Sequence, residues 1–229
     1  MNLRSALVAA LASFAYASSS VISHDQVVPF AQPTPTTALQ QAAIKYKPQI
    51  HISNGCHPYP AVDKNGNTSG GLNPTGSQSA GCKGSGYGTQ VYGRAVKYQG
   101  VYAFMYSWYM AKDETLTGLG HRHDWEACVI WVDDIAASSP NIVALSASAH
   151  SGYNKYYPPS SSYFSGNSAK VDYSSSYVVI NQGYFDCRGD ATSDHVGPAH
   201  GRGAYGAGEH GLWRRQRALQ GRQLPDEAR

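Results

Sequence analysis

Apolar and aromatic residues recur at every second position in several segments of this chain. The clearest segment alternates Tyr102, Phe104, Tyr106 and Trp108 with Ala103, Met105, Ser107 and Tyr109. Similar segments occupy residues 44–52, 125–132, 141–149 and 170–180, and turns rich in Gly, Pro and Ser separate them. A period of two places alternate side chains on one face of a strand. The pattern predicts a mainly β protein, an antiparallel β-sandwich with few helices, and no amphipathic helix between Ile44 and Ile180.

The composition fits one secreted domain. The chain has 229 residues, of which 14% are charged, against ~25% in an average soluble protein. It holds 17 Tyr and 24 Gly, and its formal net charge is +3. So small a charge, without a basic run, argues against nucleic acid as a partner.

The first residues have the pattern of a secretion signal. A charged start at Arg4 precedes an apolar stretch over residues 6–15, and Ala15-Tyr16-Ala17 resembles a cleavage site. We therefore predict a signal peptide over residues 1–17, which is too short to span a bilayer. Residues 18–37 are polar and contain prolines, so we expect an extended arm rather than a packed element.

A secreted protein forms disulfides, and this chain has four cysteines. Cys56 and Cys82 bracket a stretch rich in Gly, Pro, Asn and Ser, and we pair them; closing such a loop contributes ~3 kcal/mol. Cys128 lies in an apolar run and is predicted to be a buried free thiol. Asn67 begins a glycosylation sequon on the same loop, which we expect to be exposed.

The composition changes near Gly183. The last 47 residues contain 22 Gly, Ala or Arg, no Lys, and no strand or helix period. We expect the folded domain to cover residues 38–182 and residues 183–229 to form a disordered tail.

Acidic residues gather around the segment GHRHDWE, which runs from Gly120 to Glu126. Four of the nine acidic residues before Gly183 lie within fourteen positions: Asp113, Glu114, Asp124 and Glu126. On a strand, Asp124 and Glu126 project from the same face. At a separation of ~5 Å their repulsion is ~3 kcal/mol, which calls for a cation or solvent between them.

One imidazole and three carboxylates form the candidate ligand set. We expect the turn at Gly118 and Gly120 to swing His121 towards Asp124 and Glu126, with Asp113 closing over the same point. Such an oxygen-rich set suits Ca²⁺, Mg²⁺ or Mn²⁺ better than Zn²⁺. The alternative is a surface network in which three basic side chains neutralise the acids: Lys112, Arg122 and His123.

Two further features of this region also have two interpretations. Trp125 and the neighbouring aromatic residues belong either to the core or to a rim that contacts sugar rings or lipid headgroups. His150, in the segment SASAHSG, is either an ordinary turn residue or part of that rim.

Several motifs together resemble the NEP1-like proteins, the necrosis- and ethylene-inducing secreted toxins of oomycetes, fungi and bacteria. They are GHRHDWE, the upstream AFMYSWYMAKDETLTGL, the pair Cys56/Cys82 in SNGCHPYPAV and SAGCKGSG, and SASAHSGY. The two-cysteine pattern is similar to that of the type 1 group from oomycetes. The resemblance covers residues 24–181, and Ala111 departs from it where the family has proline.

The resemblance implies a sandwich similar to that of the actinoporins, with one divalent cation at one end. The family's metal residues correspond to Asp113, His121, Asp124 and Glu126, with Ca²⁺ or Mg²⁺ favoured over Mn²⁺ and Zn²⁺ not expected. It also implies lysis of plant plasma membranes through glycosyl inositol phosphoryl ceramide sphingolipids, without bond cleavage. Residues 103–126 resemble the peptide that plant receptor-like proteins detect.

Two other functions remain open from the sequence. A secreted metal-dependent hydrolase would use the cation or His123 to activate water, with Glu126 as general base. A non-toxic immune elicitor would keep residues 103–126 and lack lytic activity.

The tail also bears on activity. Codons can be chosen for the residues from Gly183 onward so that the same DNA, translated in a reading frame shifted by one base, encodes a peptide similar to the C-terminal segment of the family. We therefore expect a frameshift near Gln182, which would make this copy inactive if it is genuine.

Overall fold

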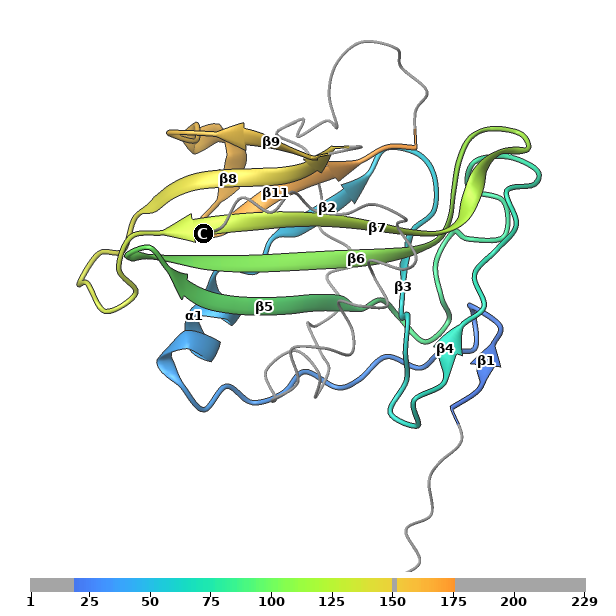
Figure 1. Cartoon of the computed structure of the whole chain (residues 1–229), viewed down its shortest axis with the longest axis horizontal. Helices are drawn as coiled ribbons and strands as arrows, with labels where there is room; N and C mark the ends of the chain where they lie inside the picture. The colour runs from blue at the N-terminus through green and yellow to red at the C-terminus, as the bar shows by residue number, and fades with distance from the viewer. Residues whose placement is uncertain (1–18, 150–151, 176–229) are drawn as a thin grey trace, which may run out of the picture.

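The computed structural model of the chain describes residues 19–149 and 152–175, and most of its regular structure is β-strand (Figure 1). The predicted signal peptide, His150 and the predicted tail lie outside these residues. The first strands and the helix are β1 Val21–Ile22, α1 Ala38–Lys45, β2 Gln49–Ile52, β3 Pro58–Tyr59 and β4 Thr68–Ser69. The later elements are β5 Val91–Tyr98, β6 Val101–Leu116, β7 Leu119–Val132, β8 Ile142–Ala149, β9 Gly152–Tyr156, the 3₁₀ turn η1 Ser161–Tyr163, β10 Phe164–Ser165 and β11 Ser168–Tyr173.

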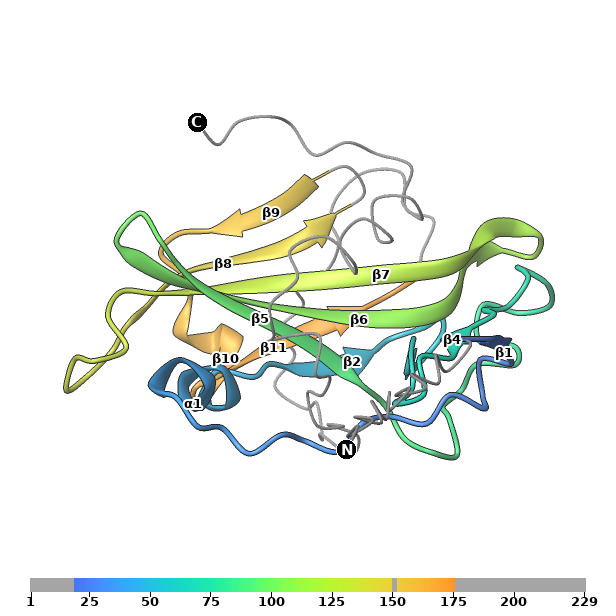
Figure 2. The same ribbon diagram turned by 60° about the horizontal axis from the view of Figure 1, so that its bottom comes forward.

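The main sheet is antiparallel and is built around the two longest strands, β6 and β7. Its strand order is β3-β6-β7-β8-β9, and β5 pairs with β6 on the same edge as β3. Pairing of β6 with β7 runs from Tyr102↔Val132 to Leu116↔Leu119. The β6–β7 turn and the β7–β8 connection lie at opposite ends of the sheet (Figures 1 and 2).

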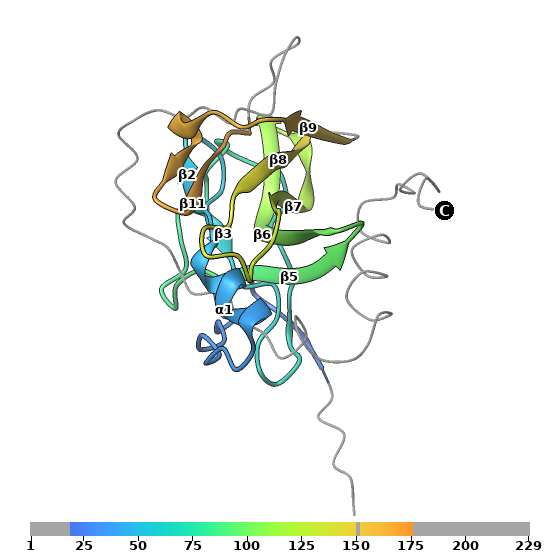
Figure 3. The ribbon, with the colours of Figure 1, turned by 90° about the vertical axis from the view of Figure 1, so that its left-hand side faces the viewer.

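A smaller sheet packs against one face of the main sheet and encloses the core between them (Figure 3). It has the order β10-β11-β2, and β11 pairs with β2 in parallel. The prediction of a β-sandwich is therefore confirmed, but the expectation of purely antiparallel pairing is wrong for this sheet. The fully buried core residues include Phe104, Tyr106, Trp108, Ile130 and Leu145.

One helix, α1, replaces part of a predicted strand. The alternation over residues 44–52 predicted a strand, yet Ile44 lies in the helix and strand pairing begins only at Gln49. The helix starts at a capping box, in which the Thr37 hydroxyl accepts from the backbone N–H of Gln40 and the Gln40 side chain accepts from that of Thr37. This start signal, together with Ala42 and Ala43 on the buried face, outweighs the short alternation.

The predicted N-terminal arm is extended but packed. Strand β1 pairs in parallel with β4, Val27 is fully buried, and His24 Nε2 lies 2.9 Å from the Gly81 carbonyl oxygen. The expectation of an unpacked arm is therefore wrong, because strand pairing and this hydrogen bond attach it to the disulfide loop.

The predicted disulfide between Cys56 and Cys82 is present, and Cys128 is a buried free thiol as predicted. Asn67 is only partly exposed, because its side-chain amide donates to Asp63 Oδ2 at 2.9 Å. The described residues contain no helix that is long and apolar enough to cross a membrane.

We expect loss of the disulfide to lower the free energy of unfolding by about 3 kcal/mol, because the unfolded chain then gains the freedom of the open loop. Urea unfolding of the Cys56→Ser/Cys82→Ser double variant measures this. A reductant should destabilise the wild type and leave the double variant unchanged. Equal stability of the two oxidised proteins would contradict the prediction.

Candidate functional site

The candidate site lies on the half of the β6–β7 pair nearest its connecting turn. Strand register places Asp113 opposite His121 and Glu126 opposite Trp108. His121 therefore lies in β7 itself, and the expectation that a preceding turn carries it is wrong. The turn is the two-residue link Thr117-Gly118, and it leaves His121 directly across the strand pair from Asp113.

Gly120 and Gly71 lie where neighbouring atoms leave no room for a side chain. A Cβ atom on Gly120 would lie 2.0 Å from the backbone oxygen of Asp113, so β6 and β7 could not pair with any side chain there. Gly71 has a φ of 64°, and a Cβ on it would lie 2.7 Å from the ring of His123. The Gly70-Gly71 backbone thus lies directly against the motif.

His123 interrupts the regular geometry of β7. Its φ is 62°, a left-handed conformation that non-glycine residues seldom adopt. Its Nδ1 lies 2.7 Å from the Tyr109 hydroxyl, which fixes the ring. Trp125 packs on the same side, with its ring 5.3 Å from Tyr109 and 5.2 Å from Tyr92. Trp125 is therefore a partly buried packing residue in this structure.

Hydroxyl groups lie within hydrogen-bonding distance of three carboxylates, those of Asp113, Asp124 and Glu126. The Tyr173 hydroxyl lies 3.4 Å from Asp113 Oδ1 and 3.5 Å from Asp124 Oδ2. The hydroxyl of Ser175 donates to Asp113, and that of Ser148 donates to Glu126. The structure thus brings the acids of β6 and β7 together with the end of β11.

The basic side chains near the motif have other partners. Lys112 forms a fully buried ion pair with Glu114 and donates to the backbone oxygens of Thr75, at 2.9 Å, and Ser77, at 3.0 Å. Arg122 donates to the Gly70 oxygen at 2.6 Å.

The alternative in which basic side chains neutralise the acids holds for Glu114, although its pair with Lys112 is fully buried and does not lie at the surface. Among the described residues, no salt bridge links Lys112, Arg122 or His123 to the other three acids, Asp113, Asp124 and Glu126.

The crowded carboxyl groups bind protons more tightly than usual. Burial, followed by the charge of Asp113, raises the pKa of Asp124 to about 6. Burial, followed by the charge of Asp124, raises the pKa of Glu126 to about 8. Burial, followed by Arg122 and His121, lowers the pKa of His123, so this imidazole does not serve as their counter-ion at neutral pH.

His121 is oriented as a ligand would be. Its Nδ1 lies 3.0 Å from the His123 backbone oxygen, and because a carbonyl only accepts, Nδ1 carries the proton. The lone pair of Nε2 is then free to bind a cation. The positive charge that His121 can carry acts on Asp124 and lowers its pKa, which places the two residues within electrostatic reach.

The donor set fits a hard divalent cation in its chemistry, since carboxylate oxygens predominate and lack a cationic partner. As they stand, no three His, Cys, Asp or Glu side chains among the described residues are close enough to share a metal ion. Asp113, His121, Asp124 and Glu126 would have to move closer together to hold one.

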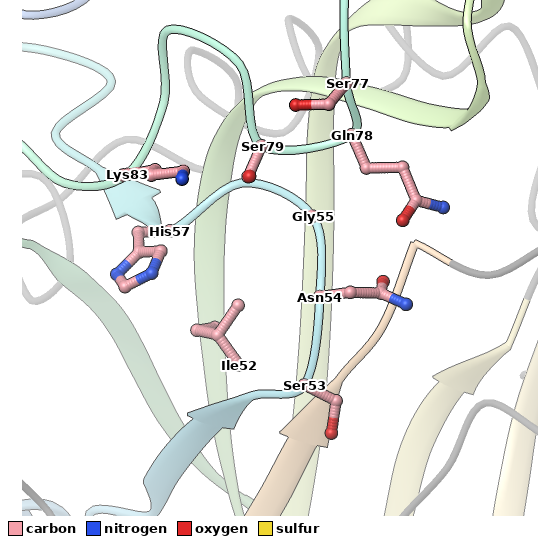
Figure 4. Close-up of a pocket in the computed structure, with 9 residues that line it drawn as sticks. All are labelled: Ile52, Ser53, Asn54, Gly55, His57, Ser77, Gln78, Ser79 and Lys83. Atoms are coloured by element: carbon pink, nitrogen blue, oxygen red, sulfur yellow. The ribbon is translucent and has the colours of Figure 1, made fainter.

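A polar pocket of about 320 Å³ lies between the β2–β3 connection and the disulfide loop (Figure 4). Gln78 lines it and donates to the backbone oxygens of Ser175 and Thr115, each at 2.8 Å. Gly55, on the opposite wall, is so close to Ser175 that a Cβ on it would lie 2.8 Å from the serine Cβ. The pocket lining therefore contacts Ser175, whose hydroxyl donates to Asp113.

Sequence reasoning missed Tyr173, Ser148 and Ser175. Each lies on or directly after a strand that the alternation predicted, but only the pairing of strands brings them to the acids. No motif in the chain marks them.

The raised pKa values predict how pH affects the cation-free protein. Unfolded carboxyl groups lose their protons near pH 4, whereas Asp124 and Glu126 keep theirs to about 6 and about 8. Their contribution to stability is therefore present at low pH and lost as pH rises through this window.

In chelator, scanning calorimetry should show a melting temperature that falls between about pH 5 and about pH 8. The fall should be smaller in the Asp124→Asn/Glu126→Gln variant, and Ca²⁺ should stabilise the wild type more at the higher pH. An equal fall in both proteins would contradict the prediction.

Comparison with known proteins identifies the family. The family model described as necrosis inducing protein (NPP1) matches residues 40–228. NLP effector protein 1 of Phytophthora capsici is 70% identical over 181 residues, which cover 79% of this chain and 76% of that protein. Necrosis-inducing protein NPP1 of Phytophthora nicotianae is 68% identical over 194 residues, 85% of this chain and 80% of that one.

Solved structures share the fold. A structure described as a toxin fold as the basis for microbial attack and plant defense has a TM-score of 0.65 and 54% identity, and covers 69% of this chain and 73% of its own. NLPPya in complex with mannosamine has a TM-score of 0.64 and 55% identity, with 69% and 72% covered. The non-toxic HaNLP3 protein has a TM-score of 0.66 and 44% identity, with 68% and 73% covered. The resemblance drawn from the motifs is confirmed, and the chain belongs to the family of necrosis inducing proteins (NPP1).

Proposed function

We propose that this protein is a secreted cytolysin that binds a membrane lipid headgroup through one divalent cation. Asp113, His121, Asp124 and Glu126 would hold the cation, with Ca²⁺ or Mg²⁺ preferred. The headgroup would be the sugar phosphate of plant glycosyl inositol phosphoryl ceramides, whose oxygens complete the coordination of the ion. The site of action is then the outer face of the plant plasma membrane.

The main support for this proposal is the negative charge of three carboxylates that no Lys or Arg side chain balances among the described residues. Asp113, Asp124 and Glu126 share a small region. In the part of the chain that the structure describes, they contact hydroxyl groups and the Trp125 backbone N–H, lie within electrostatic reach of His121, and have no Lys or Arg partner. A buried carboxylate is costly unless it is paired or bound to a metal. A divalent cation would lower the raised pKa values of Asp124 and Glu126 and leave open positions towards solvent.

Two further observations support a sugar-bearing ligand. NLPPya, a relative of the same fold, has been solved with mannosamine. In the present chain hydroxyl, amide and basic side chains line a pocket, and one of its lining residues, Gln78, donates to the backbone oxygen of Ser175, whose hydroxyl donates to Asp113. Hydroxyl-rich ligands suit such a lining, because each sugar hydroxyl can both donate and accept.

We propose that the protein is not an enzyme and that the lipid stays intact. The two candidates for a general base, His123 and Glu126, already have hydrogen bonds, between His123 Nδ1 and the Tyr109 hydroxyl and between Glu126 and the Ser148 hydroxyl. Each side chain keeps a second nitrogen or oxygen atom, so analysis of the lipid after lysis is the measurement that separates binding from hydrolysis.

A second candidate is a non-toxic immune elicitor, because the non-toxic HaNLP3 protein shares this fold. Residues 103–126 would be detected by a plant receptor-like protein. They form most of β6 and half of β7, and many of their side chains are buried. Detection would thus require the segment to be released from the sheet, and the lysis assay below separates the two candidates.

We expect Asp124→Asn to reduce leakage of headgroup-bearing vesicles by about 100-fold or more, because the substitution removes a ligand and its charge. Dye release in Ca²⁺ measures this, and mass spectrometry of the lipid should show no cleavage. Asp134→Asn, at an exposed acid in the β7–β8 loop, makes the same charge change away from the site and should lyse normally.

Leakage by Asp124→Asn at the wild-type rate would contradict the cation mechanism. Cleaved lipid would favour the hydrolase. A wild type that causes no leakage yet triggers plant immunity would favour the elicitor.

A further inference from the structure

Two leucines are exposed to solvent at the tip of the β6–β7 hairpin. Leu116 and Leu119 pair across the two-residue turn, and their exposed fractions are 55% and 58%. They are cross-strand partners and so lie side by side. These two large apolar side chains lie outside the core and together form an exposed apolar patch, which is a feature of surfaces that contact a protein or a membrane.

The tip is held rigidly in this exposed position. The Thr117 hydroxyl donates to the Gly76 oxygen at 2.8 Å, and the Gly118 N–H donates to Glu114 Oε1 at the same distance. The Thr115 hydroxyl donates to the Leu119 oxygen at 3.2 Å. Glu114 is itself fixed by the buried pair with Lys112. A rigid tip loses little conformational entropy when a partner covers it.

We propose that Leu116 and Leu119 form an apolar wedge that enters the lipid bilayer while the neighbouring carboxylates engage the headgroup through their cation. This inference rests on the proposed function and adds the second membrane contact to it. The occupant is a membrane and not a protein, because two leucine side chains offer far less area than the ~1,200 Å² of a stable protein interface.

The geometry of the strands matches the layers of a bilayer. Leu119 lies two residues beyond His121, roughly 7 Å along the strand at 3.3 Å per residue. The headgroup region on each side of the hydrocarbon core is roughly 5–7 Å thick. A cation held among the headgroups would therefore place the two leucines at the boundary with the acyl chains, the depth at which peripheral proteins insert apolar residues.

The test compares the wild type with variants of the two leucines. Co-flotation in Ca²⁺ measures how tightly each protein binds phosphatidylcholine vesicles that contain glycosyl inositol phosphoryl ceramide. We expect Leu116→Gln/Leu119→Gln to bind about tenfold more weakly or worse, since both side chains would lose apolar burial. Leu116→Met/Leu119→Met should retain wild-type binding. Val96→Gln serves as the control, because Val96 is 48% exposed on β5 towards the opposite end of the sheet. All variants should take up Ca²⁺ in solution like the wild type.

Wild-type vesicle binding by the glutamine variant would overturn the wedge. A change in its oligomeric state without a change in vesicle binding would also overturn it and would indicate a second copy of the chain. Asp124→Asn separates this inference from the proposed function. If Asp124→Asn abolishes binding and the glutamine variant does not, the wedge alone fails. If the glutamine variant weakens binding while Asp124→Asn and chelation do not, the cation mechanism alone fails.

Discussion

Repulsion among carboxylates fixed on one pair of strands is the constraint on which the site depends. The register of β6 with β7 sets Asp113 across from His121, and Asp124 and Glu126 follow along β7. Because the backbone is held by the ladder of the central sheet, these side chains have limited freedom to move apart. Burial is the first cause of the raised pKa values of Asp124 and Glu126, and repulsion from the neighbouring acid is the second. The proposed cation would offset both.

The surrounding structure keeps that pair of strands in place. The buried Lys112–Glu114 pair ties β6 to the backbone of the disulfide loop at Thr75 and Ser77. A buried ion pair is weak support for stability by itself, but breaking it would leave an unpaired charge in the interior. The disulfide limits the freedom of the same loop, and Gly70-Gly71 bring it against Arg122 and His123. The loop thus supports the motif from one side, and β11 with its following residues supports it from the other.

Much of the fold could be predicted from alternation alone, because β6, β7 and β8 are long and pack one face against the core. Helix α1 was missed because its start depends on a capping box at Thr37 and Gln40 rather than on periodicity. The acids were visible as a cluster, since sequence neighbours on a hairpin are also neighbours in space. Their hydroxyl partners were not, because Tyr173 and Ser175 follow about sixty residues after Asp113 and meet it only through packing of the two sheets. The left-handed backbone at His123 likewise has no sequence signal, because the residue is not glycine.

Isothermal titration calorimetry of the folded, chelator-treated protein with Ca²⁺ and with Mg²⁺ measures directly whether the unbalanced carboxylates bind a divalent cation. We expect uptake of one ion per chain with release of protons near neutral pH, and loss of that uptake in Asp124→Asn and Glu126→Gln. Heats no different from buffer for Ca²⁺, Mg²⁺ and Mn²⁺, or uptake that persists unchanged in both variants, would contradict it.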